Sequence, residues 1–110
     1  MDIINATTIF ATLSQPTRLE VFRLLIKAGP DGMSSGDLGV SLNVKANTMS
    51  MNLKHLLHSG LVRNERHGRQ IRYFADMSAV GSLLSYLMQD CCGGKPELCD
   101  PIIKQIACAC

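Results

Sequence analysis

The chain has 110 residues, of which 46% are hydrophobic and 18% are charged, and its formal net charge is +2. This length allows one domain with a modest core, and this composition excludes an intrinsically disordered chain. No apolar run approaches the roughly 18 residues of a membrane-spanning helix. The first ten residues lack the basic segment of a signal peptide. We therefore expect a soluble cytoplasmic protein, in which cysteines stay reduced.

The first half of the chain shows helical spacing of its apolar residues. A first helix is predicted over residues 2–13. Pro16 opens a second helix, which ends at Gly29 and the proline after it. A short third helix is expected over 35–42, and a tight connection leads to a fourth helix over about 45–59.

The apolar period changes after the fourth helix. The segments LVRNER and RQIRYF alternate as two short strands around a two-residue hairpin loop at His67-Gly68. A fifth helix is expected over about 77–90, and a last short helical turn begins at Asp100-Pro101. The sequence therefore predicts a fold that is mainly α with a small β-hairpin.

Two short helices joined by a tight turn and followed by a β-hairpin form a winged helix-turn-helix, whose second helix enters the major groove of DNA. In the fourth helix the apolar face centres on Met49, Leu53 and Leu56, and the opposite face is mostly polar. An ordinary amphipathic helix would show the same polar face. Met51 lies on that face, where it could contact a thymine methyl group or have no role.

The candidate DNA-binding residues lie at the start and on the outer side of the fourth helix, and at the tip of the hairpin. Four arginines fall between residues 63 and 72 with only Glu65 against them, a pattern that fits phosphate contacts or a solvated charged hairpin. The candidates are Lys45, Asn47, Thr48, Ser50, Met51, Asn52, Lys54, Arg66, His67, Arg69 and Gln70.

Three segments together resemble the ArsR family of bacterial metal-responsive repressors: LSQPTRLEVFRLL at 13–25, TMSMNLKHLLHSGLV at 48–62 and RHGRQIRYF at 66–74. Asn52 stands where that family often has histidine. The resemblance implies a non-enzymatic repressor that needs no cofactor, binds double-stranded operator DNA with inverted repeats and releases it when an effector binds.

The same resemblance implies a homodimer held together by the first and last helices. Residues 1–90 would then form the DNA-binding and dimerisation domain, and 91–110 a cysteine-rich segment that binds the effector. The apolar residues that suit the interface, or that alternatively fill the core of one subunit, are Ile3, Ile9, Phe10, Leu83, Leu84 and Leu87.

The stretch CCGGKPELC resembles the C-terminal cysteine site of an arsenic-responsive subgroup of the family. That likeness implies a site for trivalent arsenic at Cys91, Cys92 and Cys99, with arsenite as effector and antimonite as a second candidate. Thiolates are soft ligands that suit such ions, and Gly93-Gly94 allows the chain to reverse.

Two alternatives remain for the cysteines. Cys108 and Cys110 could add a fourth thiolate, which would make a site for zinc or cadmium. A sensor of thiol oxidation would instead form a disulfide between cysteines. Two other sites of the family are absent: SSGDLGVSLN lacks its Cys-Val-Cys, and residues 77–90 contain no histidine.

Overall fold

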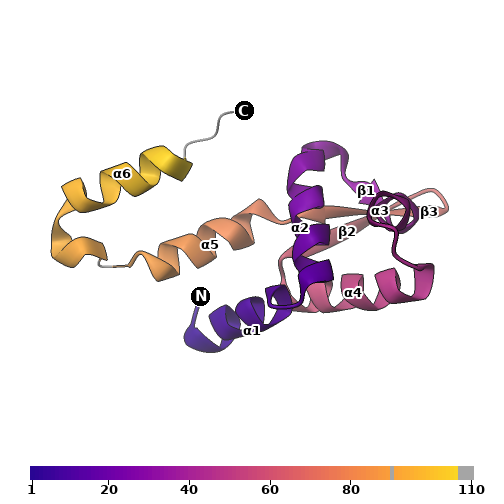
Figure 1. Cartoon of the computed structure of the whole chain (residues 1–110), viewed down its shortest axis with the longest axis horizontal. Helices are drawn as coiled ribbons and strands as arrows, with labels where there is room; N and C mark the ends of the chain where they lie inside the picture. Colours follow the sequence, from indigo (N-terminus) through magenta and orange to yellow (C-terminus); the bar gives the residue numbers. More distant parts are fainter. Residues whose placement is uncertain (90, 107–110) are drawn as a thin grey trace.

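The computed structural model describes residues 1–89 and 91–106, apart from the side chains of residues 91, 92 and 96. Six α-helices, two short 3-10 helices and three strands make up this described part (Figure 1). In chain order they are α1 (Ile3–Leu13), α2 (Pro16–Ala28), η1 (Gly29–Asp31), β1 (Met33–Ser34), α3 (Ser35–Leu42), α4 (Ala46–Ser59), β2 (Val62–His67), β3 (Gln70–Ala75), α5 (Met77–Leu87), η2 (Cys91–Gly94) and α6 (Pro96–Ile106).

Side-chain caps fix where several helices begin. Asp2 accepts a hydrogen bond of 2.8 Å from the backbone N–H of Asn5 and starts α1. Ser34 accepts one of 3.1 Å from the N–H of Asp37 and starts α3. Such caps satisfy backbone donors that have no partner inside the helix.

The three described strands form one antiparallel sheet in the order β1-β3-β2. The β2–β3 pair is the predicted hairpin, and its last pairing, His67 with Gln70, leaves Gly68-Arg69 as the loop. The loop predicted at His67-Gly68 was therefore wrong by one residue. Strand β1, whose two residues pair with Tyr73 and Arg72 of β3, was not predicted, because two residues are too few to show an alternating pattern.

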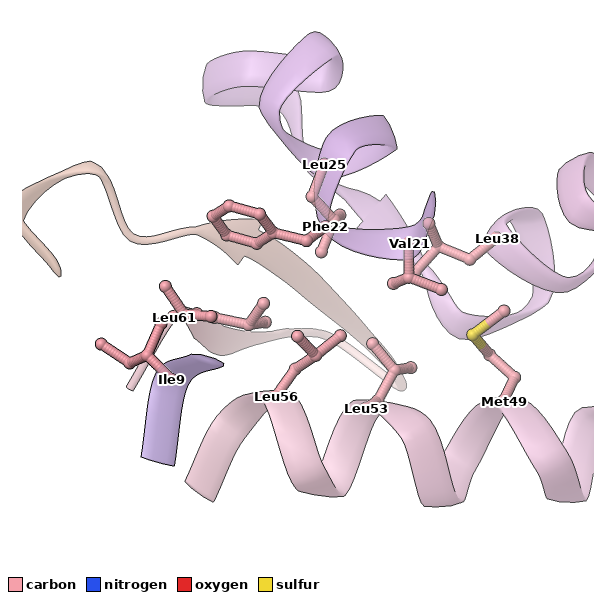
Figure 2. Close-up of a cluster of buried hydrophobic side chains, with 10 residues drawn as sticks. Ile9, Val21, Phe22, Leu25, Leu38, Met49, Leu53, Leu56 and Leu61 are labelled. Carbon is pink, nitrogen blue, oxygen red and sulfur yellow. The ribbon is translucent and has the colours of Figure 1, made fainter. Parts of the chain in front are cut away.

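The core lies between α4, α2, α3 and the root of the sheet. Figure 2 shows Met49, Leu53 and Leu56 pointing from α4 toward Val21 and Leu38, and all five side chains are at most 1% exposed. Full burial of one such side chain stabilises the fold by roughly 1.5–3 kcal/mol. Because this packing fixes which face of α4 is buried, it also fixes which face is exposed.

The C-terminal part of the chain differs from the prediction in two elements, α5 and α6. A short helical turn was expected from Asp100, but α6 begins at Pro96 and runs for 11 residues. Pro101 lies inside it without ending it, and α5 ends at Leu87, earlier than the predicted 90. In Figure 1 the helices α5 and α6 extend away from the body formed by α1–α4 and the sheet.

Candidate functional site

The turn between α3 and α4 sets the angle at which α4 is presented. Asn43 ends α3 in the left-handed conformation, with φ 53°. The backbone N–H of Val44 then bonds the carbonyl of Gly39 at 2.9 Å. A Cβ at Gly39 would lie 2.9 Å from the Val44 carbonyl oxygen, so only glycine allows this close approach. The helix-turn-helix predicted from the sequence is present.

The outer face of α4 presents most of the residues predicted to contact DNA. Asn47, Ser50 and Lys54 are exposed, and Met51 is 57% exposed among them. Lys45 and Thr48 are exposed at the start of the helix. The Asn47 Oδ1 accepts a hydrogen bond of 2.9 Å from the N–H of Thr48. The donors of the side-chain NH₂ group do not take part in this bond and can serve a base.

Asn52 does not share this face. It is 7% exposed and lies with Met49, Leu53 and Leu56 on the buried side of α4. The prediction that Asn52 contacts DNA disagrees with this burial, because a base edge must meet an accessible side chain. The physical reason is the helical period, which turns residues three and four apart to the same side.

The four arginines of the hairpin fall into two pairs. The guanidinium of Arg72 donates hydrogen bonds to the backbone carbonyls of Asp31 at 2.9 Å and Gly32 at 3.0 Å, which ties β3 to the chain before β1. Arg63 donates to Glu65 at 2.6 Å. Both side chains are therefore held by the protein itself.

Arg66 and Arg69 form the second pair. Both are exposed, and within the described part of the chain neither makes an ion pair or a side-chain hydrogen bond. Arg69 lies in the hairpin loop and Arg66 on the strand beside it. Their charges are thus available to an anionic partner. The other two hairpin candidates are engaged: Gln70 accepts from Arg72 at 3.3 Å, and His67 pairs with Glu65.

Glu65 is the acidic centre of one face of the hairpin. Its Oε2 lies 3.1 Å from His67 Nε2, and its Oε1 accepts from Arg63. These hydrogen bonds, from His67 first and Arg63 second, hold the pKa of Glu65 below its usual range. The carboxylate therefore stays charged at neutral pH and partly neutralises the hairpin.

The hairpin tip and the beginning of α4 lie toward the same end of the molecule, opposite to α5 and α6 (Figure 1). The long axis measures 50 Å, so the two ends are well separated. One end thus carries the first exposed polar residues of α4 together with the exposed arginines of the hairpin tip. The other end carries the cysteine segment.

The cysteine segment folds back on itself as the glycine pair predicts. Gly93 and Gly94 have φ of 59° and 83°, values that favour glycine. After this reversal α6 packs against η2. Cys99, in the second turn of α6, is 4% exposed and disulfide-bonded.

The predicted trio of Cys91, Cys92 and Cys99 is not tested by the structure, because the side chains of the first two lie outside the described residues. Cys108 and Cys110 also lie outside them. Among the side chains that the structure describes, which exclude those of Cys91 and Cys92, there is no cluster of three or more histidine, cysteine or acidic residues that could hold a metal ion. The effector site remains a prediction.

Two features of the site escaped the sequence analysis. The role of Arg72 depends on carbonyls about 40 residues away, so no local pattern could indicate it. The amphipathic character of α6 was visible in its spacing, with apolar residues at 98, 99, 102, 103 and 106. It was not predicted because proline favours the first turn of a helix, which pointed to a start at Asp100-Pro101.

No described helix has the length and apolar character needed to cross a membrane. Residues 13–65 match a family model described as a helix-turn-helix domain. No curated protein matches the chain. The architecture is that of a winged helix-turn-helix, and solved structures of transcriptional regulators share it.

Three of these solved structures illustrate the likeness. An ArsR-like transcriptional regulator from Rhodococcus sp. RHA1 has 29% identity and a TM-score of 0.72, and the match covers 97% of this chain and 96% of that one. The transcriptional repressor BigR from Xylella fastidiosa has 27% identity and a TM-score of 0.60, over 76% and 84% of the two chains. A possible ArsR-family regulator from Mycobacterium bovis, described as a homodimeric winged helix-turn-helix DNA-binding domain, has 19% identity and a TM-score of 0.65, over 80% and 82%.

Proposed function

We propose that the chain is a cytoplasmic, DNA-binding transcriptional repressor of the ArsR type, which holds operator DNA as a homodimer and releases it when trivalent arsenic binds. The likeness over nearly the whole length of the Rhodococcus regulator supports the regulatory part of this proposal. The observation that carries it is that the beginning of α4 and the hairpin tip, where Arg66 and Arg69 are exposed, lie at the same end of the molecule.

The DNA contacts divide into two kinds. Asn47 and Ser50, exposed near the start of α4, are suited to base edges in the major groove. Lys45, Lys54 and the exposed Arg66 and Arg69 are suited to phosphates, which fix the position of the protein without reading sequence. Met51, which is 57% exposed, offers an apolar contact for a thymine methyl group.

The surfaces of α1 and α5, which contain no charged residue, support the proposed dimer. Ile3 is 65%, Phe10 47%, Leu84 40% and Leu87 51% exposed, and no residue of α5 is fully buried. Ile9 is 2% exposed and belongs to the core of one subunit, so we no longer count it among the interface residues. A second copy would cover these apolar side chains and place two α4 helices ~34 Å apart, one turn of DNA.

The effector site rests on the fold of the cysteine segment. Cys99 is buried in α6, which packs back on η2, where Cys91 and Cys92 lie. Three thiolates gathered on one arsenic or antimony ion would restrain the segment that follows α5. Because α5 belongs to the proposed dimer interface, this restraint would change the spacing of the α4 helices. A coupling of about 1–3 kcal/mol would weaken DNA binding roughly 5–150-fold.

A specific observation favours a second candidate, a thiol-redox repressor. Cys99 is disulfide-bonded in the structure. Two thiols and one molecule of hydrogen peroxide would give this disulfide and two molecules of water, and the disulfide would restrain the same segment as the ion. A zinc or cadmium site would need a further ligand, for which Cys108 and Cys110 are available in the sequence.

The test is a titration of the reduced protein, bound to labelled DNA from its own promoter, with arsenite, zinc and peroxide in parallel. Arsenic sensing predicts release by arsenite alone, and Cys92→Ser should bind the DNA but ignore arsenite. Cys110→Ser serves as the control outside the trio and should respond as wild type. Release by peroxide alone would favour the redox candidate, and arsenite release that survives Cys92→Ser would contradict the proposed site.

A further inference from the structure

The outer side of α2 bears an apolar groove that α1 and α3 help to line. Its volume is about 580 Å³. Leu19 and Ile26 are 41% and 38% exposed along it, so this groove presents a contiguous apolar surface of the kind that marks an interaction site. The apolar lining consists of Leu13, Leu19, Phe22, Leu24, Ile26 and Leu42.

Helix α6 presents the complementary surface. Residues 98, 99, 102, 103 and 106 fall on one side of the helix, within an arc of about 140° at 100° per residue. Cys99 is buried, but Leu98 is 56%, Ile102 43%, Ile103 60% and Ile106 59% exposed. Three large isoleucines and a leucine therefore form an apolar stripe that the described part of its own subunit leaves uncovered.

The α2 groove and helix α6 carry opposite net charges. The groove is flanked by Arg23 and Lys27 against Glu20. Helix α6 carries Glu97 and Asp100 against Lys104. The groove thus has a net positive edge and α6 a net negative charge, so the two attract each other. The same negative charge argues against an anionic membrane surface as the occupant.

The path of the chain keeps the stripe away from the groove of its own subunit. Helix α5 carries η2 and α6 beyond the body of the molecule (Figure 1). The main neighbour of α6 in the described residues is η2, and α2 packs instead on α1, α3, α4 and the sheet. A second copy, by contrast, would bring its own α6 as a projecting arm.

We propose that α6 of one copy docks its apolar stripe into the α2 groove of a second copy. The second copy docks its own α6 into the groove of the first in the same way. This inference rests on the proposed homodimer and adds an interface to the α1 and α5 surfaces. It also gives the cysteine segment a role in assembly, because that segment connects α5 to the docked arm.

A zero-length cross-linking experiment tests the contact directly. Protein labelled with heavy nitrogen is mixed with an equal amount of unlabelled protein and treated with a carbodiimide, which joins a lysine amine to a nearby carboxylate. We expect a cross-link between Lys27 and Glu97 or Asp100 in peptide pairs that combine the two labels. Cross-links confined to pairs with a single label would mean docking within one chain and would overturn the proposal, as would their absence.

Variants of the groove and the stripe provide the second measurement. Ile26→Glu places a charge in the groove, and Ile103→Glu places one on the stripe. Each should raise amide hydrogen exchange across α6 by about tenfold. The matched control is Val40→Glu, because Val40 is 85% exposed on α3 and does not line the groove. Unchanged exchange in α6 for both variants would overturn the proposal.

A charge exchange separates direct docking from general destabilisation. Arg23→Glu and Asp100→Arg should each increase exchange in α6, and the double variant should restore part of the protection. Sedimentation of each protein, without DNA or arsenite, reports the dimer independently. A dimer without interchain contacts between α2 and α6 would overturn this inference alone, whereas a monomer would overturn the proposed dimer as well.

Discussion

The guanidinium of Arg63 lies over the ring of Phe74, with its Cζ 4.5 Å from the ring centroid. Phe74 is 4% exposed, so this contact joins a surface charge to the edge of the core. The same guanidinium is bonded to Glu65. An arginine held in this way supports the hairpin and cannot reach a phosphate without losing both contacts.

The first prediction therefore separates Arg66 and Arg69 from Arg63. Arg66→Ala and Arg69→Ala should each weaken DNA binding and reduce the salt dependence, because each lost phosphate contact lowers the slope of log affinity against log salt by about 0.9. Arg63→Ala removes the same charge and is the matched control. It should leave the slope nearly unchanged. An equal change of slope in all three variants would contradict the division of the arginines.

Arg72 provides the second prediction, which concerns stability. Arg72→Met keeps much of the aliphatic length but removes the hydrogen bonds to the carbonyls of Asp31 and Gly32. We expect a loss of about 1–3 kcal/mol in the free energy of unfolding, measured by urea titration. Arg72→Lys can keep one of these bonds and should lose less. DNA binding that falls without any change in stability would argue instead for a direct contact.

The third prediction contrasts two asparagines of α4. Asn47→Ala should lower affinity for the operator by about 1–3 kcal/mol and leave non-specific binding nearly unchanged, because a base contact is lost. Asn52→Ala changes a side chain that is 7% exposed, so it should act on the unfolding midpoint. Competition binding with operator and random DNA, beside thermal unfolding, measures both. The reverse pattern would place Asn52 at the DNA.

The helices and the hairpin could be predicted because their signals are local. Pro16, Gly29 and Gly60 mark ends that the backbone requires, and Gly60 indeed has φ 83°. The spacing of Met49, Leu53 and Leu56 indicated the buried face of α4. The two-residue β1 could not be predicted, because its pairing with β3 joins residues about 40 positions apart.

The candidate site was predictable in composition but not in arrangement. The basic character of the hairpin was evident, yet the contact of Arg63 with Phe74 depends on strand register, and the hydrogen bonds of Arg72 depend on a distant turn. Asn52 was a DNA candidate because it stands where the resembled family often has histidine, but the helical period places it on the buried side of α4. Side-chain direction and pairing are three-dimensional properties that residue type alone does not determine.

The last prediction concerns Asp76, which caps α5 and so orients the helix that leads to the cysteine segment. Its Oδ1 accepts hydrogen bonds from the Ser78 hydroxyl at 2.6 Å and from the backbone N–H groups of Ser78 and Ala79 at 3.0 and 3.3 Å. The Ser78 hydroxyl is the main cause that lowers the pKa of this carboxyl. Because the folded pKa is depressed, the stabilisation is present above the unfolded pKa and is lost as the pH falls through the folded pKa.

Asp76→Ala should therefore cost about 0.5–2 kcal/mol in the free energy of unfolding at neutral pH, and Asp76→Asn should cost less, because asparagine is also a good cap. The gap between wild type and Asp76→Asn should stay constant down to about pH 5 and shrink as the pH falls below about 4, where the carboxyl of the unfolded chain is already protonated. Urea unfolding across this pH range measures it, with circular dichroism as the signal. A gap that stays constant with pH would mean that the charge of Asp76 does not stabilise α5.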